Sequence, residues 1–374
     1  MKGLTSLSLT VVVCLFIGAV SALGQSAYRT SGPYTHQNLT IFLIHGGDVN
    51  SNKNLITLQE AMEMKVFKVY ETEDVNELIV ENISPKYDVF IQSGDIVKGG
   101  KQDRVLAISI IVPRNSGKVS IEAFCVESDR WDGRGDENEK EFSSSEERIV
   151  SKELKIAANG VVSGSGSGDG VGSGSASAAG SGNGNVIVSG ARSSGPGTGS
   201  GGGSQTAVWN EVANAQRNIS ANVTVDVTAN SSATSLQLSL ENKKLVRTRE
   251  EFAMNFADLL KGKTDVIGYA FAINGEINSA DIYVSNHLFT KLWPKMLNAT
   301  VTEAISLADK EKAESEPTAG DITSFISKAE KGKARERQTV AKSKVVTRQT
   351  ENEVVYEAKD KAGVVVHRSF VKLN

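Results

Sequence analysis

A glycine- and serine-rich tract divides this chain of 374 residues into two segments with different sequence patterns. Residues 160–204 contain 17 glycines and 12 serines, and only Asp169 and Arg192 in this tract are charged. A segment of this composition buries too little apolar surface to offset the entropy that it would lose on ordering. The sequence therefore predicts a disordered insertion over 159–206, with folded chain before and after it.

The first 24 residues are typical of a signal peptide. Lys2 provides a basic start, residues 9–20 are apolar, and Val20-Ser21-Ala22 offers small side chains for cleavage. No later stretch reaches the ~18 apolar residues that a membrane-spanning helix requires. We therefore expect a secreted or periplasmic protein that has no membrane span after cleavage. Cleavage would leave Cys125 as the single cysteine, which excludes an intramolecular disulfide.

The segment 25–158 is expected to be rich in β-structure. Short apolar or alternating runs are separated by Gly, Pro and Asn, which is typical of an antiparallel or sandwich-like sheet. The expected strands are 38–44, 66–71, 77–81, 87–92, 104–112 and 118–127, with one short helix over 57–64. Residues 128–153 are charged and aperiodic, so they are interpreted as a solvated loop.

The segment 207–309 shows a different, αββα pattern. Asn274-Gly275 is a strong turn signal between two strand-like runs, and therefore predicts a hairpin. Thr248 and Glu251 form a possible capping box, and Pro294 predicts a kink or break in the last helix. The expected elements are helices 208–216, 248–262 and 287–308, and strands 265–273 and 276–284.

The last segment, 310–374, is interpreted as a charged helix or linker followed by a small hairpin around 361–363. Residues 328–348 hold eight Lys or Arg and two Glu, a composition that is usually solvated. Because the αββα segment alone is small for independent stability, we expect it to share one core with the front segment. The predicted fold class is α+β, with an N-terminal antiparallel sheet packed on the αββα unit.

Composition excludes several common classes of protein. The formal net charge of −3 gives no basic excess of the kind that nucleic-acid binding requires. The four histidines form no metal-binding spacing, so we expect no metal and no cofactor.

Two blocks resemble a known bacterial family of uncharacterised function. Residues 93–131 contain Gly100-Lys101-Gln102-Asp103-Arg104, a β-run that ends in Val-Pro, and Cys125-Val126-Glu127 shortly before Arg130-Trp131. Residues 268–299 add a second, weaker block. Both are similar to the ARG and rhodanese-phosphatase-superfamily-associated protein domain. Asp103 is a departure, because Asn is commoner there. The resemblance implies a fold but no assigned activity, since the family name records association with ADP-ribosylglycohydrolase-like and rhodanese- or phosphatase-like genes.

The first block also supplies the candidate ligand-binding residues. Lys101, Gln102 and Arg104 follow a Gly-Gly turn, whose glycines allow close approach of a ligand while the side chains offer donors to an anion. Glu127, Arg130 and Trp131 can form a recognition patch for a flat ligand. The structural alternatives are a charged surface turn for the first set and an ion pair beneath a tryptophan anchor for the second.

Cys125 and Asp281 are the weak catalytic candidates. Cys125 ends an apolar strand, and His45, His287 or His367 could approach it in space, but a buried structural cysteine is commoner. Asp281 could serve acid–base chemistry, or could cap or bind near the start of the helix at 287.

The sequence thus favours an exported binding or scaffold module, whose partner is a small anionic ligand or a protein and not a nucleic acid. A hydrolase or transferase acting on a nucleotide- or ADP-ribose-like substrate is the first alternative, and a structural envelope protein is the second.

Overall fold

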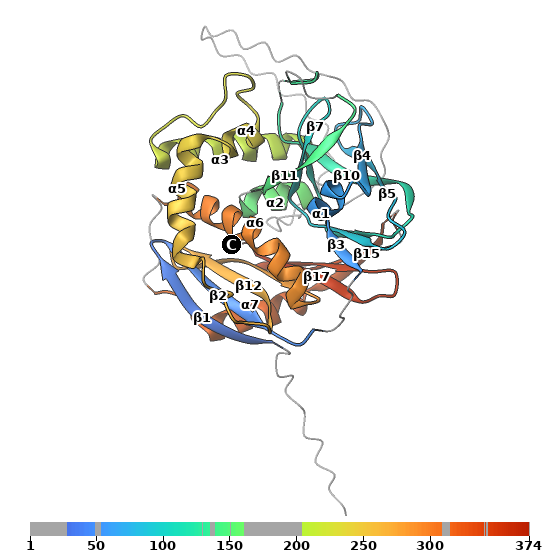
Figure 1. Ribbon diagram of the computed structural model, residues 1–374. Coiled ribbons are helices and arrows are strands. Elements are labelled where there is room, and N and C mark those ends of the chain that lie inside the picture. Colours follow the sequence, from blue (N-terminus) through green and yellow to red (C-terminus); the bar gives the residue numbers. More distant parts are fainter. Residues whose placement is uncertain are drawn as a thin grey trace, which may run out of the picture.

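The computed structural model describes residues 28–48, 54–128, 130–134, 139–149, 151–160, 204–308, 315–339, 341 and 343–373. The expected signal peptide, and nearly all of the expected disordered insertion, lie outside these ranges. The described part is an α+β fold with seven α-helices and 17 strands in three sheets (Figure 1).

The largest sheet has eight antiparallel strands and combines both ends of the chain. The front hairpin, residues 29–45, pairs with the central hairpin, residues 266–283, which pairs in turn with the last strand of the chain. In sheet order the strands are β1 (Arg29–His36), β2 (Leu39–His45), β12 (Val266–Ile273), β13 (Glu276–Tyr283), β17 (Val365–Lys372), β16 (Glu353–Lys359), β15 (Lys344–Gln349) and β14 (Lys333–Gln338). The segment 310–374 therefore contributes four strands to this sheet.

A second sheet of six strands curls into a nearly closed barrel. Its order is β11 (Phe142–Arg148), β7 (Asp95–Gly99), β8 (Arg104–Leu106), β10 (Gly117–Cys125), β5 (Glu77–Asn82) and β4 (Phe67–Tyr70). An isolated antiparallel bridge between Tyr70 and Glu141 joins β4 back to the start of β11. A third sheet contains β3 (Leu55–Thr57), β6 (Asp88–Ile91) and β9 (Ile110–Val112), and its β3–β6 pair is parallel.

Helices cover both faces of the eight-stranded sheet. The long α6 (Asn286–Ser306) packs on one face, and α7 (Ala319–Glu330) packs on the other against Phe42, Ile267 and Phe370 (Figure 1). The remaining helices are α1 (Leu58–Glu63), α2 (Lys152–Asn159), α3 (Gln205–Val223), α4 (Leu236–Leu240) and α5 (Lys243–Ala253), followed by a 3₁₀ turn η1 (Met254–Phe256).

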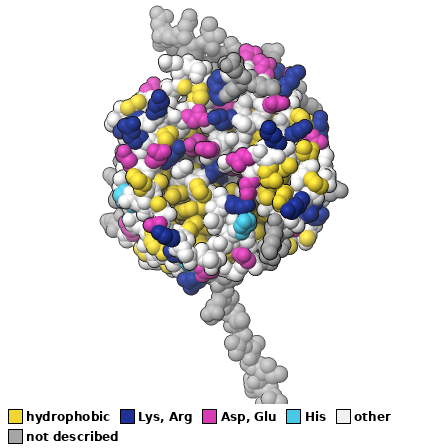
Figure 2. All heavy atoms as spheres, viewed as in Figure 1, with side chains coloured by type: hydrophobic (Ala, Val, Ile, Leu, Met, Phe, Trp, Pro, Cys, Tyr) yellow, Lys and Arg dark blue, Asp and Glu magenta, His cyan; other side chains and the backbone are white. Residues whose placement is uncertain are grey.

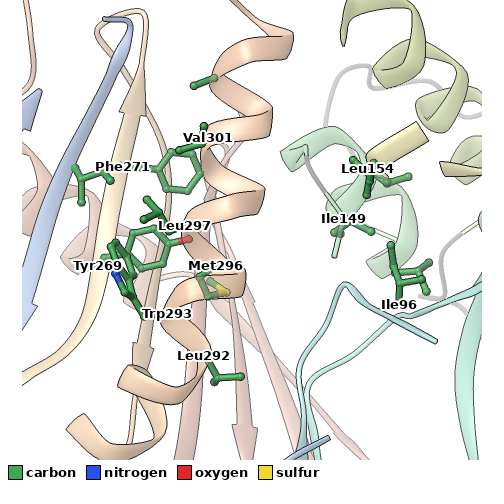
Figure 3. Packing of buried hydrophobic residues seen from close by; sticks show 14 of the residues in the cluster. Ile96, Ile149, Leu154, Tyr269, Phe271, Leu292, Trp293, Met296, Leu297 and Val301 are labelled. Carbon is green, nitrogen blue, oxygen red and sulfur yellow. The ribbon is translucent and has the colours of Figure 1, made fainter. Parts of the chain in front are cut away.

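The main hydrophobic cluster joins residues from both sides of the Gly/Ser tract. In Figure 3, Tyr269 and Phe271 of β12 point toward Trp293 and Leu297 of α6. The same cluster continues through Ile96, Ile149 and Leu154 to α2 and α3. The Ser204 amide donates a hydrogen bond to the carbonyl oxygen of Ala157 at 3.2 Å, so the tract leaves and re-enters the fold at one place.

Several local predictions are confirmed. The Asn274-Gly275 hairpin forms as β12 and β13, and the short helix expected over 57–64 forms as α1. The break that was one of the two outcomes expected at Pro294 does not occur, because α6 continues through this residue to Ser306. The hairpin around 361–363 also forms, as β16 and β17.

Other predictions are wrong, for identifiable reasons. Residues 128–153 are not only a solvated loop, because β11 and the start of α2 lie there. The run 104–112 is two strands in two sheets, because the chain turns away after Leu106. The helix expected over 248–262 begins at Lys243 with Asn242 as its N-cap, so Thr248 lies in its interior.

Candidate functional site

The six residues predicted to bind ligand form what we call the Trp131 cluster: Lys101, Gln102, Arg104, Glu127, Arg130 and Trp131. The Lys101 Nζ atom lies 5.6 Å from the centroid of the Trp131 ring, and the Arg104 guanidinium carbon lies 5.8 Å from it. Arg130 Nη1 donates to the Gly100 carbonyl oxygen at 3.4 Å, which links the patch to the turn. Lys101 and Arg104 therefore lie beside the Trp131 ring, and Arg130 lies beside the turn that precedes Lys101.

The basic side chains of the Trp131 cluster are paired with acids of the protein. Arg104 is fully buried, and its Nη2 donates to Glu71 Oε1 at 3.0 Å. Lys101 Nζ lies 2.9 Å from Glu73 Oε1, and Arg130 Nε donates to Glu127 Oε2 at 2.9 Å. Because each cation already has an anionic partner, the cluster offers little free positive charge to a ligand.

The two glycines of the preceding turn allow close packing of the protein against itself. A Cβ on Gly99 would lie 2.6 Å from the carbonyl oxygen of Glu141, and one on Gly100 would lie 2.3 Å from the Phe142 ring. Both residues also have positive φ angles. The two glycines therefore allow the start of β11 to approach this turn closely, which is the space that the sequence analysis assigned to a ligand. Three buried atoms of the cluster still lack hydrogen-bond partners: Gln102 Oε1, Arg104 Nε and Glu127 Oε1.

Cys125 is fully buried at the end of β10. Its backbone is held by Gln205, which accepts from the Cys125 amide at 2.9 Å and donates to its carbonyl oxygen at 2.8 Å. Burial raises the pKa of the Cys125 thiol to about 12. The thiol therefore stays protonated at neutral pH, which does not suit a nucleophile.

Asp281 lies in a different place, toward the C-terminal end of β13, and is buried. Its Oδ1 atom is 3.0 Å from His367 Nε2 and 3.6 Å from Lys155 Nζ. Burial would raise the pKa of Asp281, but the Lys155 charge and the His367 hydrogen bond outweigh it and hold the pKa below its usual value. Asp281 does not cap the helix at 287, because Ser285 is the N-cap of α6.

A small cavity, which we call the Asp281 cavity, opens beside this aspartate. Its volume is about 30 Å³. It is lined by Arg148, Ile149, Ser151, Lys152, Lys155, Tyr269, Phe271, Ser279, Asp281, Ala299, Thr300 and Glu303. It therefore lies where β11 and α2 meet β12, β13 and α6.

Basic side chains approach the Asp281 cavity from β11 and α2. Arg148 is 5% exposed, and its Nη2 donates to the Ser93 carbonyl oxygen at 2.6 Å. The Nε atom of Arg148 is buried and has no hydrogen-bond partner. Lys155 contacts Ser369 through Nζ, and burial lowers the pKa of Lys155. Together with Lys152, the cavity is lined by three basic and two acidic side chains.

The second acid of the cavity is Glu303, on α6. Its Oε1 atom accepts from the Lys152 backbone amide at 3.0 Å and from Asn278 Nδ2 at 2.8 Å. Burial, reinforced by the charge of Glu153, raises the pKa of Glu303 to about 7. The cavity thus contains two carboxyl groups whose pKa values are shifted in opposite directions, a feature common at functional sites.

A buried hydrogen-bond chain continues behind Asp281. His367 Nδ1 lies 3.1 Å from Ser109 Oγ, and the His367 ring stacks on Tyr283 with 4.7 Å between centroids. Burial lowers the pKa of His367, despite the neighbouring Asp281. Ser109 and His367 do not line the cavity.

Sequence reasoning found Asp281 but missed the residues around it. Arg148, Lys152 and Lys155 lie in or beside the stretch interpreted as a loop. Two local signals of the helix α2 were missed. The Ser151 side chain accepts a hydrogen bond from the Leu154 amide at the start of the helix, and Gly160 ends the helix in the left-handed conformation. Nothing in the sequence near Glu303 indicates that it approaches Asp281.

Within the described ranges, no three His, Cys, Asp or Glu side chains gather in a way that could hold a metal ion. Among the same residues, no helix has the length and apolar character needed to cross a bilayer. Figure 2 shows acidic and basic side chains interspersed over the visible face.

Comparison with known proteins identifies one family. Neither the curated proteins nor the solved structures contain a match to this chain. A family model, the ARG and Rhodanese-Phosphatase-superfamily-associated Protein domain, matches residues 27–371. That match spans both sides of the Gly/Ser tract and includes the Trp131 cluster and the Asp281 cavity. The chain therefore belongs to the ARG and Rhodanese-Phosphatase-superfamily-associated Protein domain family.

Proposed function

We propose that this protein is an exported ligand-binding module, and that its ligand is a small anion or the anionic group of a larger molecule. The ligand group would enter the Asp281 cavity. The observation that carries the proposal is that Arg148, which lines the cavity together with two further cations, has a buried Nε atom with no hydrogen-bond partner. An unpaired buried donor is costly, and an anionic oxygen would satisfy it.

Position and size support the same ligand class. The cavity lies at the N-terminal end of α2, where the helix dipole favours negative charge. A volume of about 30 Å³ holds two or three water-sized spheres of ~10–15 Å³ each. One carboxylate or one face of a phosphate group is therefore the most that enters.

Glu303 makes the binding dependent on pH. With a pKa of about 7, its carboxyl group is neutral in mild acid and becomes negative as the pH rises. A charged Glu303 would repel an anion in the same cavity. We therefore expect anion affinity to fall as the pH rises through 7.

Calorimetric titration with inorganic phosphate and with acetate tests this proposal. The Lys152→Gln variant removes one cation of the cavity, and Lys243→Gln is the matched control, because both lysines directly follow an N-cap. We expect Lys152→Gln to weaken binding at least fivefold and Lys243→Gln to leave it unchanged. Absence of binding to either anion, or equal losses in both variants, would contradict the proposal.

An enzymatic function at the same cavity is the second candidate. The favouring observation is the carboxyl pair, in which Glu303 has a raised pKa and Asp281 a lowered one. Such a pair could supply a general acid and a general base to a hydrolase or transferase acting on a nucleotide- or ADP-ribose-like substrate. Turnover of such a substrate, lost in Glu303→Gln and with a rate inflection near pH 7, would favour the enzyme over the binding module.

The Trp131 cluster stays a predicted alternative site. Trp131 is 39% exposed, so a flat ligand could stack on it. Titration of tryptophan fluorescence with nucleotides, in the native chain and in Trp131→Phe, separates this site from the cavity. Quenching that disappears in Trp131→Phe and persists in Lys152→Gln would assign the ligand to the Trp131 cluster.

Export is the part of the proposal that depends on residues 1–24 alone. The sequence there offers cleavage after Ala22 or after Gly24. Intact-mass analysis of the expressed protein should therefore find a mature chain that begins at Leu23 or Gln25. A chain that retains Met1 in the cytoplasmic fraction would exclude export by this route.

A further inference from the structure

The eight-stranded sheet ends in a strand, β14, that is exposed along its whole length. All six of its residues are exposed, and among the residues that the structure describes it pairs with β15 alone. Its other edge is therefore open to a further strand.

The backbone groups on this open edge can be assigned from one hydrogen bond. The Thr339 amide donates to the Ser343 carbonyl oxygen at 2.9 Å, so the backbone of Thr339 faces β15. Backbone groups alternate along an antiparallel strand, and the pairing of β14 with β15 has no register shift. The amides and carbonyl groups of Ala334, Glu336 and Gln338 therefore turn outward, where a further strand would meet them.

One face of β14 is basic. Because side chains alternate along a strand, Lys333, Arg335 and Arg337 share this face. Arg337 Nη2 donates to Glu122 Oε2 of β10 at 3.1 Å, so Arg337 already has an acidic partner. Within the described ranges, Lys333 and Arg335 have no such partner. Two exposed cations thus lie two residues apart beside the open edge.

These charges oppose antiparallel pairing of β14 with a second copy of itself. Residues that lie opposite each other in such a pair share a face, so the basic face of one copy would meet the basic face of the other. Like charges directly opposite each other are destabilising. A strand that carries acids at alternate positions would instead place its carboxylates opposite Lys333 and Arg335.

We propose that β14 binds an extended segment of a partner protein that carries acidic side chains at alternate positions, and that this segment adds to the sheet as an antiparallel strand. The outward backbone groups of β14 would supply the main source of affinity. The carboxylates opposite Lys333 and Arg335 would supply specificity. Three strands separate β14 from β13, which carries Asp281, so this binding is independent of the Asp281 cavity.

Fluorescence polarisation with three labelled heptapeptides tests the proposal. The alternating probe is Thr-Glu-Thr-Glu-Thr-Glu-Thr. A rearranged control, Glu-Glu-Thr-Thr-Thr-Thr-Glu, has the same composition and charge but no two acids two residues apart. A basic control is Thr-Lys-Thr-Lys-Thr-Lys-Thr. We expect the alternating probe to bind at least threefold more tightly than the rearranged control and at least tenfold more tightly than the basic one. Equal affinity for the two acidic peptides, or no binding of the alternating probe, would overturn the proposal.

Two charge reversals locate the site. Lys333→Glu acts on β14, and Lys68→Glu is the matched control, because Lys68 is an exposed lysine on β4, a terminal strand of the other large sheet. We expect Lys333→Glu to weaken binding of the alternating probe at least tenfold and Lys68→Glu to change it less than twofold. Equal effects would mean that only net charge matters, which contradicts a specific edge.

Removal of one outward amide tests strand addition itself. Ala334→Pro deletes a donor that does not face β15, a position where an edge strand tolerates proline, and Ala334→Val is the control that keeps the amide. We expect both variants to retain the circular dichroism spectrum of the native chain, and only Ala334→Pro to lose binding of the alternating probe. Retained binding by a folded Ala334→Pro chain would contradict strand addition. Self-association in ultracentrifugation that Ala334→Pro abolishes and the alternating probe does not reverse would assign the edge to a second copy and overturn the proposal.

Discussion

Glu303 shows how burial, reinforced by the nearby charge of Glu153, can raise the pKa of a carboxyl group. Its side chain sits between α2 and β13, where two hydrogen-bond donors reach the same oxygen atom. These donors do not fully compensate for the lost hydration, so the pKa rises to about 7. The folded protein therefore holds this proton more tightly than the unfolded chain does.

The consequence is a loss of stability with rising pH. Between the ordinary pKa of 4.5 and the folded value of about 7, the Glu303 contribution falls by about 3 kcal/mol. Asp281 and His367 have lowered pKa values and act in the opposite sense, so the comparison must be made between variants. We expect urea denaturation of Glu303→Gln, relative to the native sequence, to show a gain of about 3 kcal/mol between pH 4.5 and pH 7.5. A difference that does not vary with pH would contradict this assignment.

Cys125 gives a second prediction at the scale of the residue. Because burial raises its pKa to about 12, the thiol should not react with Ellman's reagent in the folded mature chain at pH 8. In denaturant, one thiol per chain should react, and none in Cys125→Ala. Rapid reaction of the native thiol would revive the nucleophilic role that the sequence left open.

At the scale of the element, Gly268 determines how β12 pairs with its neighbours. It lies beside a register shift between β12 and β2, and a Cβ at this position would lie 2.2 Å from the Asp281 carbonyl oxygen. Only glycine allows β13 to approach this closely, and β13 is the strand that carries Asp281.

Replacing this glycine should therefore be costly. We expect Gly268→Ala to lower the free energy of unfolding by about 3 kcal/mol, because the strands must separate. Gly320→Ala is the control, because an added Cβ there meets only an ordinary contact at 3.5 Å near the start of α7. It should leave stability unchanged or raise it by up to about 1 kcal/mol. Similar values for the two variants in urea denaturation would contradict the tight strand contact.

Local signals predicted those elements that are encoded over a few residues. Asn274-Gly275 predicted the central hairpin, and the pattern over 57–64 predicted the short helix α1. The run 104–112 shows the limit of such signals. Apart from Arg104 and Ser109 it is apolar, and only pairing with β10 and with β6 divides it into β8 and β9.

The whole molecule is held together across the Gly/Ser tract. The first hairpin, β1–β2, completes a sheet whose other strands all follow the tract, and the main hydrophobic cluster contains residues from both segments. Each segment alone would expose a sheet edge or a large apolar face.

We therefore expect a cut in the tract to leave the protein assembled. A specific protease site placed near residue 180 should give two fragments that co-purify and unfold in a single transition. The uncut chain that carries the same site is the control. Fragments that separate in native buffer and melt independently would show that the segments do not need each other.

The sequence alone was sufficient for the α+β class and for the family, because β-strand alternation, turn residues and the block at 93–131 are local patterns. It also identified Asp281 as a polar residue worth testing. Only the tertiary structure brought Lys155, Arg148 and Glu303 around that aspartate, since Arg148 and Lys155 precede the Gly/Ser tract whereas Asp281 and Glu303 follow it. The tertiary structure also pairs the cations of the Trp131 cluster with acids. Among the described residues, it joins β4 to the start of β11 by a single bridge. Contacts of this kind depend on how sheets and helices pack, and no pattern within a few residues records them.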